Sequence, residues 1–230
     1  MKKPLIAMFL TLLLAGCESG DSGLDSLGLN QSPDESETVK ANEVTKITPA
    51  WICSYSGKPI TGDIWAFETE DQAQAVADRI LAHMGLKPNF TVQAADVPNA
   101  AACMHGSRRL ILYNEDFMVR MENATKTDWA AISIFAHEIG HHLNAHTLSR
   151  GGSNPKLELE ADEFSGHVLA KMGASLDEAQ TAMRILGDEF GSATHPPRSD
   201  RIAAITNGWN KGRKIIIIGD HGHDEVVGIA

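Results

Sequence analysis

The stretch that most constrains this chain is His137-Glu138-Ile139-Gly140-His141, an H-E-x-x-H sequence inside an apolar run that begins at Trp129. Residues four apart lie on one face of a helix, so His137 and His141 are predicted to project side by side and to share one metal ion. Glu138 would lie beside that ion as a general base. The pattern predicts the metal centre of a zinc hydrolase. The alternative is a buried helix that carries two histidines.

Composition limits the class of protein. The 230 residues are 43% hydrophobic and 22% charged, which fits one globular domain with some extra chain attached. The formal net charge is −10, and no cluster of Lys or Arg stands out. An acidic body of this kind argues against nucleic acid or an anionic membrane surface as the main partner.

The chain begins with an apolar segment, residues 5–14, that follows a pair of lysines. It is too short to span a bilayer, and its length is typical of an export signal over residues 1–16. It ends in Leu14-Ala15-Gly16-Cys17, which resembles the lipobox of bacterial lipoproteins. The resemblance implies acylation of Cys17 and, because Glu18 follows, an anchor in the outer membrane with the protein facing the periplasm. The alternative is an ordinary secretory signal.

Residues 17–46 are rich in Ser, Gly, Asp and Glu and have neither aromatic residues nor hydrophobic periodicity. Such a segment buries too little apolar area to offset its ordering entropy, so it is predicted to be a disordered tether. A sorting or regulatory role is the alternative. The globular composition that follows predicts a domain over residues 47–213 and a strand-and-turn tail over residues 214–230, in which His221 and His223 are interpreted as turn residues.

Once Cys17 is acylated, Cys53 and Cys103 are the remaining cysteine pair. An exported protein folds in an oxidising compartment, so the pair predicts a disulfide. Two buried free thiols are the alternative.

A second helix, expected to begin at Lys156, carries the acidic pattern of residues 158–162. The pattern resembles that of gluzincin metallopeptidases, in which a glutamate on the next helix is the third zinc ligand. An aspartate one turn later receives the N–H of a ligating histidine in that class. The resemblance implies that Glu158 binds the metal and that Asp162 supports it, whereas Glu160 is expected to face solvent.

Two further histidines follow the motif, His142 and His146. If the helix continues to His146, they are rotated from His141 by about 100° and about 140°. Neither would share the metal face, and both are predicted to be polar surface residues.

Three segments in order, residues 137–141, 158–162 and 194–202, resemble the signatures of the CAAX-prenyl-protease, HtpX and BepA type of zinc peptidase. The resemblance implies an α+β fold, a mostly helical gluzincin-type metallopeptidase domain with a small sheet. A substrate-facing edge strand would lie near residues 98–106. It also implies one zinc ion bound by His137, His141 and Glu158, with Glu138 as the catalytic base.

The last segment adds His195 and Arg201, which fall where that family has a histidine and an arginine close to the zinc. The resemblance implies that they stabilise a transition-state oxyanion, or that His195 occupies the fourth zinc position and keeps the enzyme latent. From the sequence alone, His195 before two prolines is typical of a turn. The chain lacks the membrane-spanning helices of some branches, and fewer than 30 residues follow Ile205. It therefore resembles a soluble lipoprotein branch most.

The function expected from these features is zinc-dependent hydrolysis of peptide bonds in envelope proteins by a membrane-tethered periplasmic endopeptidase, in quality control. Its partners would be polypeptide substrates and the membrane that holds its lipid anchor. Alternatives are a zinc-scaffold binding or chaperone-like lipoprotein with latent activity, or metal buffering by the ten histidines. The substrate and the oligomeric state stay open.

Overall fold

The structure, a computed structural model, describes residues 45–49, 51–57, 60, 62–66, 71–148, 154–218 and 224–228. The chain divides into two units, Met1–Glu43 and Val44–Ala230, and all described residues belong to the second. The predicted signal peptide, the lipidation site Cys17, and both His221 and His223 therefore lie outside the described residues. Within the described ranges, no helix is long and apolar enough to cross a membrane.

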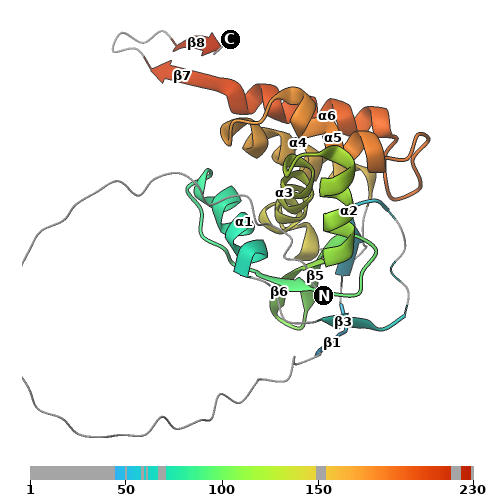
Figure 1. Cartoon of the computed structure of the whole chain (residues 1–230). Helices are drawn as coiled ribbons and strands as arrows, with labels where there is room; N and C mark the ends of the chain where they lie inside the picture. The colour runs from blue at the N-terminus through green and yellow to red at the C-terminus, as the bar shows by residue number, and fades with distance from the viewer. Residues whose placement is uncertain are drawn as a thin grey trace, which may run out of the picture. The chain divides into compact units, whose positions relative to one another are not determined.

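A four-stranded sheet forms one layer of the body (Figure 1). Its strand order is β2 (Trp51–Ser54), β5 (Ala100–His105), β6 (Arg108–Tyr113) and β4 (Thr91–Ala94). Strands β5 and β6 form a hairpin, β4 runs parallel to β6, and β2 runs antiparallel to β5.

The prediction of a substrate-facing edge strand near residues 98–106 is wrong for this structure. Strand β5 lies between β2 and β6, so both of its edges are paired. The outer position is taken by β2, and its pairing is extended by the hydrogen bond from Tyr55 N to Ala100 O at 3.1 Å. The sequence could not show this because a strand's neighbour is fixed by long-range pairing and not by its own residues.

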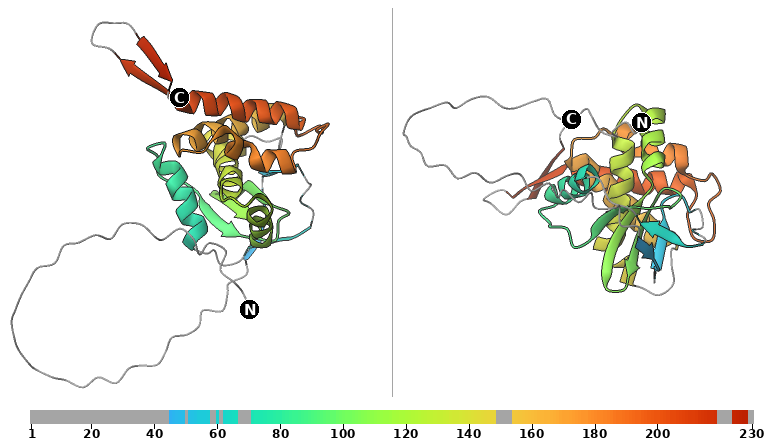
Figure 2. Two further views of the ribbon diagram at one scale, coloured as in Figure 1. Left: turned by 45° about the horizontal axis from the view of Figure 1, so that its top comes forward. Right: turned by 60° about the horizontal axis from the view of Figure 1, so that its bottom comes forward.

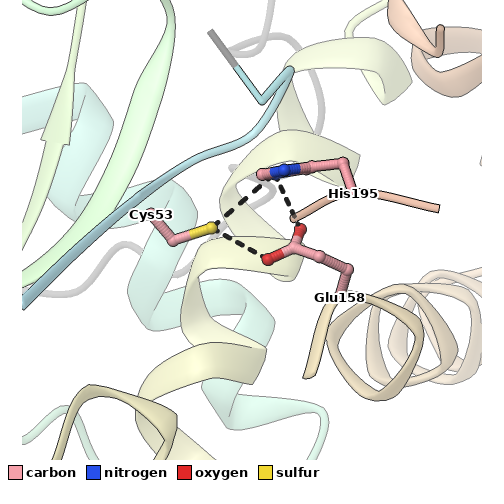
Figure 3. Close-up of side chains that lie close together, drawn as sticks. All are labelled: Cys53, Glu158 and His195. Atoms are coloured by element: carbon pink, nitrogen blue, oxygen red, sulfur yellow. Dashed lines mark hydrogen bonds and ion pairs between the residues drawn. The ribbon is translucent and has the colours of Figure 1, made fainter. Parts of the chain in front are cut away.

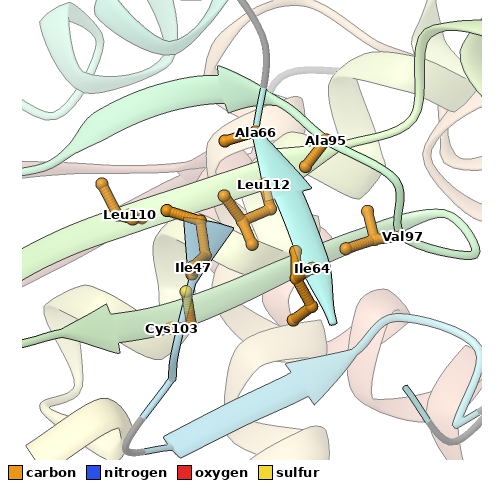
Figure 4. Close-up of a cluster of buried hydrophobic side chains, with 8 residues drawn as sticks. All are labelled: Ile47, Ile64, Ala66, Ala95, Val97, Cys103, Leu110 and Leu112. Atoms are coloured by element: carbon orange, nitrogen blue, oxygen red, sulfur yellow. The ribbon is translucent and has the colours of Figure 1, made fainter. Parts of the chain in front are cut away.

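A second, two-stranded sheet pairs β1 (Thr45–Ile47) with β3 (Ile64–Ala66). Its apolar side chains and those of the hairpin form a buried cluster (Figure 4). The cluster comprises Ile47, Ile64, Ala66, Ala95, Val97, Cys103, Leu110 and Leu112. The sequence alternation of Leu110 and Leu112 places both side chains on this face of β6, as expected for a strand with period two.

The helical layer is centred on α3 (Trp129–Leu143), which packs on β5 and is flanked by four other helices (Figure 2). These are α1 (Asp71–Ala82), α2 (Glu115–Thr125), α4 (Pro155–Lys171) and α5 (Leu176–Leu186). A 3-10 turn, η1 (His146–Leu148), follows α3. Residues 132–142 of α3 are all buried, so the apolar run creates a helix enclosed on nearly all sides, as predicted.

The last helix, α6 (Arg198–Arg213), lies along α4 at very short distance. A β-carbon on Gly208 would lie 1.8 Å from Glu163 O, and one on Gly166 would lie 2.0 Å from Ile205 O. Only glycine allows the two backbones to approach this closely. After α6, β7 (Lys214–Ile218) and β8 (Asp224–Gly228) pair as an antiparallel hairpin. The described fold is thus mixed helix and strand, which is compatible with the predicted α+β class.

Candidate metal centre

Helices α3 and α4 bring together the three residues predicted to bind a metal. The two imidazole Nε2 atoms of His137 and His141 are 3.1 Å apart. Glu158 Oε2 is 3.3 Å from His137 Nε2, and Glu158 Oε1 is 3.5 Å from His141 Nε2. In a tetrahedral zinc site with bonds of about 2.0–2.1 Å, neighbouring ligand atoms lie about 3.3 Å apart. Each separation is therefore close to the edge length of such a tetrahedron, although the two distances to Glu158 end on different carboxylate oxygens.

Contacts behind the two imidazoles determine which nitrogen faces the site. Asp162 Oδ1 accepts from His137 Nδ1 at 2.8 Å. His141 Nδ1 lies 2.9 Å from His146 Nδ1, and His146 Nε2 lies 3.0 Å from Glu160 Oε2. Because an ionised carboxylate only accepts, His146 donates through Nε2 and accepts from His141 at Nδ1. In the neutral state both site-facing Nε2 atoms then carry lone pairs, which repel unless a proton or a cation lies between them.

The prediction that His142 and His146 are surface residues is wrong, because both are buried. The helix does not continue to His146, because α3 ends at Leu143 and Ala145 adopts a left-handed φ of 59°. This turn folds His146 back beneath His141. His142 faces away from the metal ligands, with its Nε2 3.0 Å from Leu110 O.

Electrostatics favour positive charge at the centre. Burial lowers the pKa of His137, but the charge and hydrogen bond of Asp162, aided by Glu158, outweigh burial and raise it to about 9. Burial and the neighbouring His137 hold the pKa of His141 well below its usual value. Burial opposes ionisation of Glu158, yet the adjacent imidazoles hold the pKa of Glu158 well below its usual range. Glu158 is thus ionised, and a metal cation can replace the proton on His137.

Glu138 is fully buried beside this centre, on α3. Its Oε2 accepts from Ala102 N of β5 at 2.7 Å, and its Oε1 is buried without a hydrogen-bond partner among the described residues. Burial raises the pKa of Glu138 to about 8, against the opposing charge of His137 and the hydrogen bond from Ala102. Without a metal this carboxyl group is mostly protonated at neutral pH, and a cation bound beside it would favour the ionised form that can accept a proton.

Arg201 reaches the centre from α6. Its Nε and Nη2 bind the two carboxylate oxygens of Asp162 at 2.7 and 2.9 Å, and its Nη1 donates to Tyr55 O at 2.8 Å. Burial works against its charge, but Asp162 raises the pKa of Arg201, so the guanidinium is permanently cationic. In this conformation Arg201 orients Asp162, which in turn orients His137.

His195, in the loop before α6, is 6% exposed and lies over the same centre. Its Nε2 is 3.0 Å from Ser54 O and 3.3 Å from Glu158 Oε2, and its Nδ1 is 3.0 Å from Thr194 Oγ1. Since a carbonyl oxygen only accepts, His195 Nε2 carries the proton and has no lone pair directed at the site. Both residues of the predicted third segment are therefore close to the metal ligands, as the resemblance implies.

The predicted disulfide between Cys53 and Cys103 is not formed, and both cysteines are buried. Cys53 pairs with Ala102 and Ile52 pairs with Cys103, so the cysteines are offset by one position between neighbouring strands. Residues offset by one position point to opposite faces of a sheet. The Cys103 side chain joins the hydrophobic cluster, where burial raises the pKa of its thiol to about 12.

Cys53 points toward Glu158 and His195, a contact that no sequence pattern predicts (Figure 3). Its Sγ lies 2.9 Å from Glu158 Oε1 and 3.8 Å from His195 Nε2. Two sets of potential ligands result, one of His137, His141 and Glu158 and one of Cys53, Glu158 and His195. In each set the ligand atoms lie within 4.8 Å of one another. The donor atoms, their spacing and the repelling lone pairs all fit a small divalent cation such as zinc.

No protein-family model, curated protein or solved structure matches this chain. The chemistry of the site is therefore inferred from its own residues.

Proposed function

We propose that this protein is a zinc-dependent endopeptidase of the gluzincin class. The observation that carries the proposal is the tetrahedral spacing of His137, His141 and Glu158, with both imidazoles oriented to present lone pairs to one point. Glu138, with one free carboxylate oxygen beside that point, completes the set needed for hydrolysis. If the buried helix carried its two histidines by chance, we would not expect a glutamate and two oriented imidazoles at ligand spacing.

A bound zinc ion supplies Lewis-acid polarisation of a substrate carbonyl and acidifies water at this site. Glu138 accepts the proton of the attacking water at Oε1 and later donates it to the leaving amine. Asp162 holds His137 through its Nδ1, while Arg201 fixes both oxygens of Asp162. His195 carries a proton on Nε2, which suits it to donate to the oxyanion of the transition state once that proton leaves Ser54 O.

The proposed location rests on the sequence, and the proposed substrate class rests on that location. We propose that the lipobox at residues 14–17 anchors the protein in the outer membrane and that the protein cleaves polypeptides of the bacterial envelope. Labelling with a radioactive fatty acid tests the anchor. Label should be found on the wild type and be lost in Cys17→Ser.

The substitution Glu138→Gln tests the activity. Removal of the base should reduce cleavage of an unfolded protein by about 10²- to 10⁴-fold, while one zinc ion per chain is retained. Elemental analysis and a gel-based cleavage assay measure the two quantities. Equal cleavage by wild type and by the zinc-loaded variant would rule out Glu138 as the base.

His83→Ala is a matched control, because His83 is exposed at the end of α1. It should change neither zinc content nor cleavage. If His83→Ala lowered the zinc content as much as His137→Ala does, histidine-rich metal buffering would replace the proposal.

A further inference from the structure

Tyr55 is a buried aromatic residue that contacts the candidate metal centre and that no step of the proposed mechanism uses. It follows β2 directly and is 2% exposed. Its ring centroid lies 4.9 Å from that of His137, and the two ring planes meet at 82°. Edge-to-face contacts of this kind are a preferred arrangement of aromatic rings. The contact therefore limits rotation of an imidazole that is proposed to bind the metal.

The same ring contacts the guanidinium that supports His137. Arg201 Cζ lies 5.2 Å from the centroid of the Tyr55 ring, within the range of a cation–π interaction. Asp162 already joins His137 to Arg201, through hydrogen bonds of 2.8 Å to the imidazole and of 2.7 and 2.9 Å to the guanidinium. The ring of Tyr55 thus connects the same two groups that the carboxylate of Asp162 connects.

Both ends of Tyr55 are held in place. Its N–H donates to Ala100 O of β5 at 3.1 Å, and its carbonyl oxygen accepts from Arg201 Nη1 at 2.8 Å. Its hydroxyl lies beside the side chain of Ser133, about one turn of α3 before His137. Because the backbone and the hydroxyl are both fixed, the ring has a defined position against the imidazole.

The alternative is that Tyr55 only fills space in the core. The other tyrosine of the chain, Tyr113, is also 2% exposed and also packs on α3, with its ring centroid 5.5 Å from that of Phe135. Phe135 is not one of the proposed metal ligands. If both tyrosines had only a packing role, loss of either ring would have the same kind of effect. A positioning role predicts that only Tyr55 influences the metal.

We propose that Tyr55 is a positioning residue of the metal centre, whose ring holds the His137 imidazole and the Arg201 guanidinium in the orientation that presents His137 Nε2 to the ion. Tyr55 acts through its ring and is not itself a ligand. This inference rests on the proposed function, since the ion that it concerns is the one proposed there.

The zinc affinity of the full-length protein, measured by competition with a fluorescent chelator, tests this role. Tyr55→Leu should weaken zinc binding by about tenfold, which is typical of groups that orient a metal ligand. Tyr55→Phe keeps the ring and should retain the affinity of the wild type. Tyr113→Leu is the matched control, and it should lower the melting temperature without changing the zinc affinity.

Nuclear magnetic resonance provides a readout that a loss of packing alone would not change. With one equivalent of Co²⁺ bound, the Nδ1 protons of His137 and His141 should give two paramagnetically shifted resonances. Tyr55→Leu should move one of them and leave the other in place, whereas Tyr55→Phe and Tyr113→Leu should move neither. In the zinc-loaded wild type, nuclear Overhauser contacts should connect the ring protons of Tyr55 to those of His137, and this measurement needs no variant.

The outcomes separate this inference from the peptidase proposal. Wild-type zinc affinity in a folded Tyr55→Leu protein, or equal weakening by Tyr55→Leu and Tyr113→Leu, would overturn the role of Tyr55. If Tyr55→Leu does not fold, absence of the Overhauser contacts in the wild type would overturn it. In each of these cases the wild type still binds zinc, so the peptidase proposal stands. A wild-type protein that binds no metal would overturn the peptidase proposal and this inference with it.

Discussion

His146 connects the proposed metal ligand His141 to the protein surface through a chain of contacts that ends at Glu160. Without it, the ring of His141 would be free to expose either nitrogen to the site. Supporting groups of this kind typically contribute 10- to 100-fold to metal affinity. His146→Ala should therefore weaken zinc binding by about that factor, as measured by competition with a fluorescent chelator. Glu160→Gln should have a smaller effect, since an amide oxygen can still accept the hydrogen bond.

His142 makes the stability of the metal-free protein depend on pH. Burial lowers the pKa of His142 to about 4, against a hydrogen bond to Leu110 O and beside the charge of Arg109. In the unfolded chain the pKa of this histidine is about 6.5. Between about pH 4 and 6.5, His142 therefore binds a proton in the unfolded chain but not in the folded one. Stability therefore rises with pH between about 4 and 6.5, and it is lost as pH falls through that interval.

His142→Gln should remove this contribution. A shift of roughly two pKa units corresponds to about 3 kcal/mol, so the difference in unfolding free energy between variant and wild type should change by up to that amount across the interval. Urea titrations of the metal-free proteins at several pH values measure it. A difference that does not vary with pH would contradict the assigned pKa.

At the scale of elements, the contact of α4 with α6 determines whether Arg201 reaches Asp162. Gly208 lies about two turns beyond Arg201, and a β-carbon there would meet the backbone of Glu163. Gly208→Ala should push α6 away and destabilise the fold by about 3 kcal/mol or more. Thermal unfolding measures the loss, and Asn207→Ala, on the exposed side of α6, is the control that should change stability little.

The same variant should reduce metal affinity. If α6 moves, the two hydrogen bonds from Arg201 to Asp162 lengthen and His137 loses its fixed orientation. A Gly208→Ala protein that is less stable but binds zinc with unchanged affinity would show that Arg201 does not act through Asp162.

Sequence reasoning works best here where the relevant spacing lies inside one helix. The i and i+4 relation of His137 and His141, and that of Glu158 and Asp162, predict which side chains share a face, and the structure places all four together. The resemblance also placed His195 and Arg201 near the centre. For the two helix pairs the geometry is local, and for His195 and Arg201 it was implied by the resemblance of a motif.

The missed features depend on contacts that local patterns do not encode. His146 reaches His141 through a left-handed turn at Ala145, a conformation that alanine rarely adopts. The position of Cys53 depends on which strand β2 pairs with and in which register. The disulfide was predicted from the number of cysteines, and that number does not show which face of the sheet each cysteine occupies.

For the whole molecule, the metal ion would join segments that are far apart in sequence. His137 and His141 lie on α3 and Glu158 lies on α4, so their common ligation restrains the packing of the two helices. An ion bound only by the folded state, at a thousand times its dissociation constant, stabilises by about 4 kcal/mol. Zinc should therefore raise the melting temperature, and a chelator should lower it. His137→Ala should show neither response in differential scanning fluorimetry.

The short strand β2 has a further property, which follows from the alternation of its side chains between the two faces of the sheet. Alternate residues of a strand face opposite sides, and Cys53 is one step away from the position opposite Cys103. If β2 slid by a single residue, the two sulfurs would share a face at a separation that a disulfide can span, and Glu158 and His195 would lose their thiol neighbour. A one-residue shift in the register of the four-residue strand β2 thus decides whether the Cys53 sulfur lies beside the candidate metal centre or beside a second thiol with which it can be oxidised.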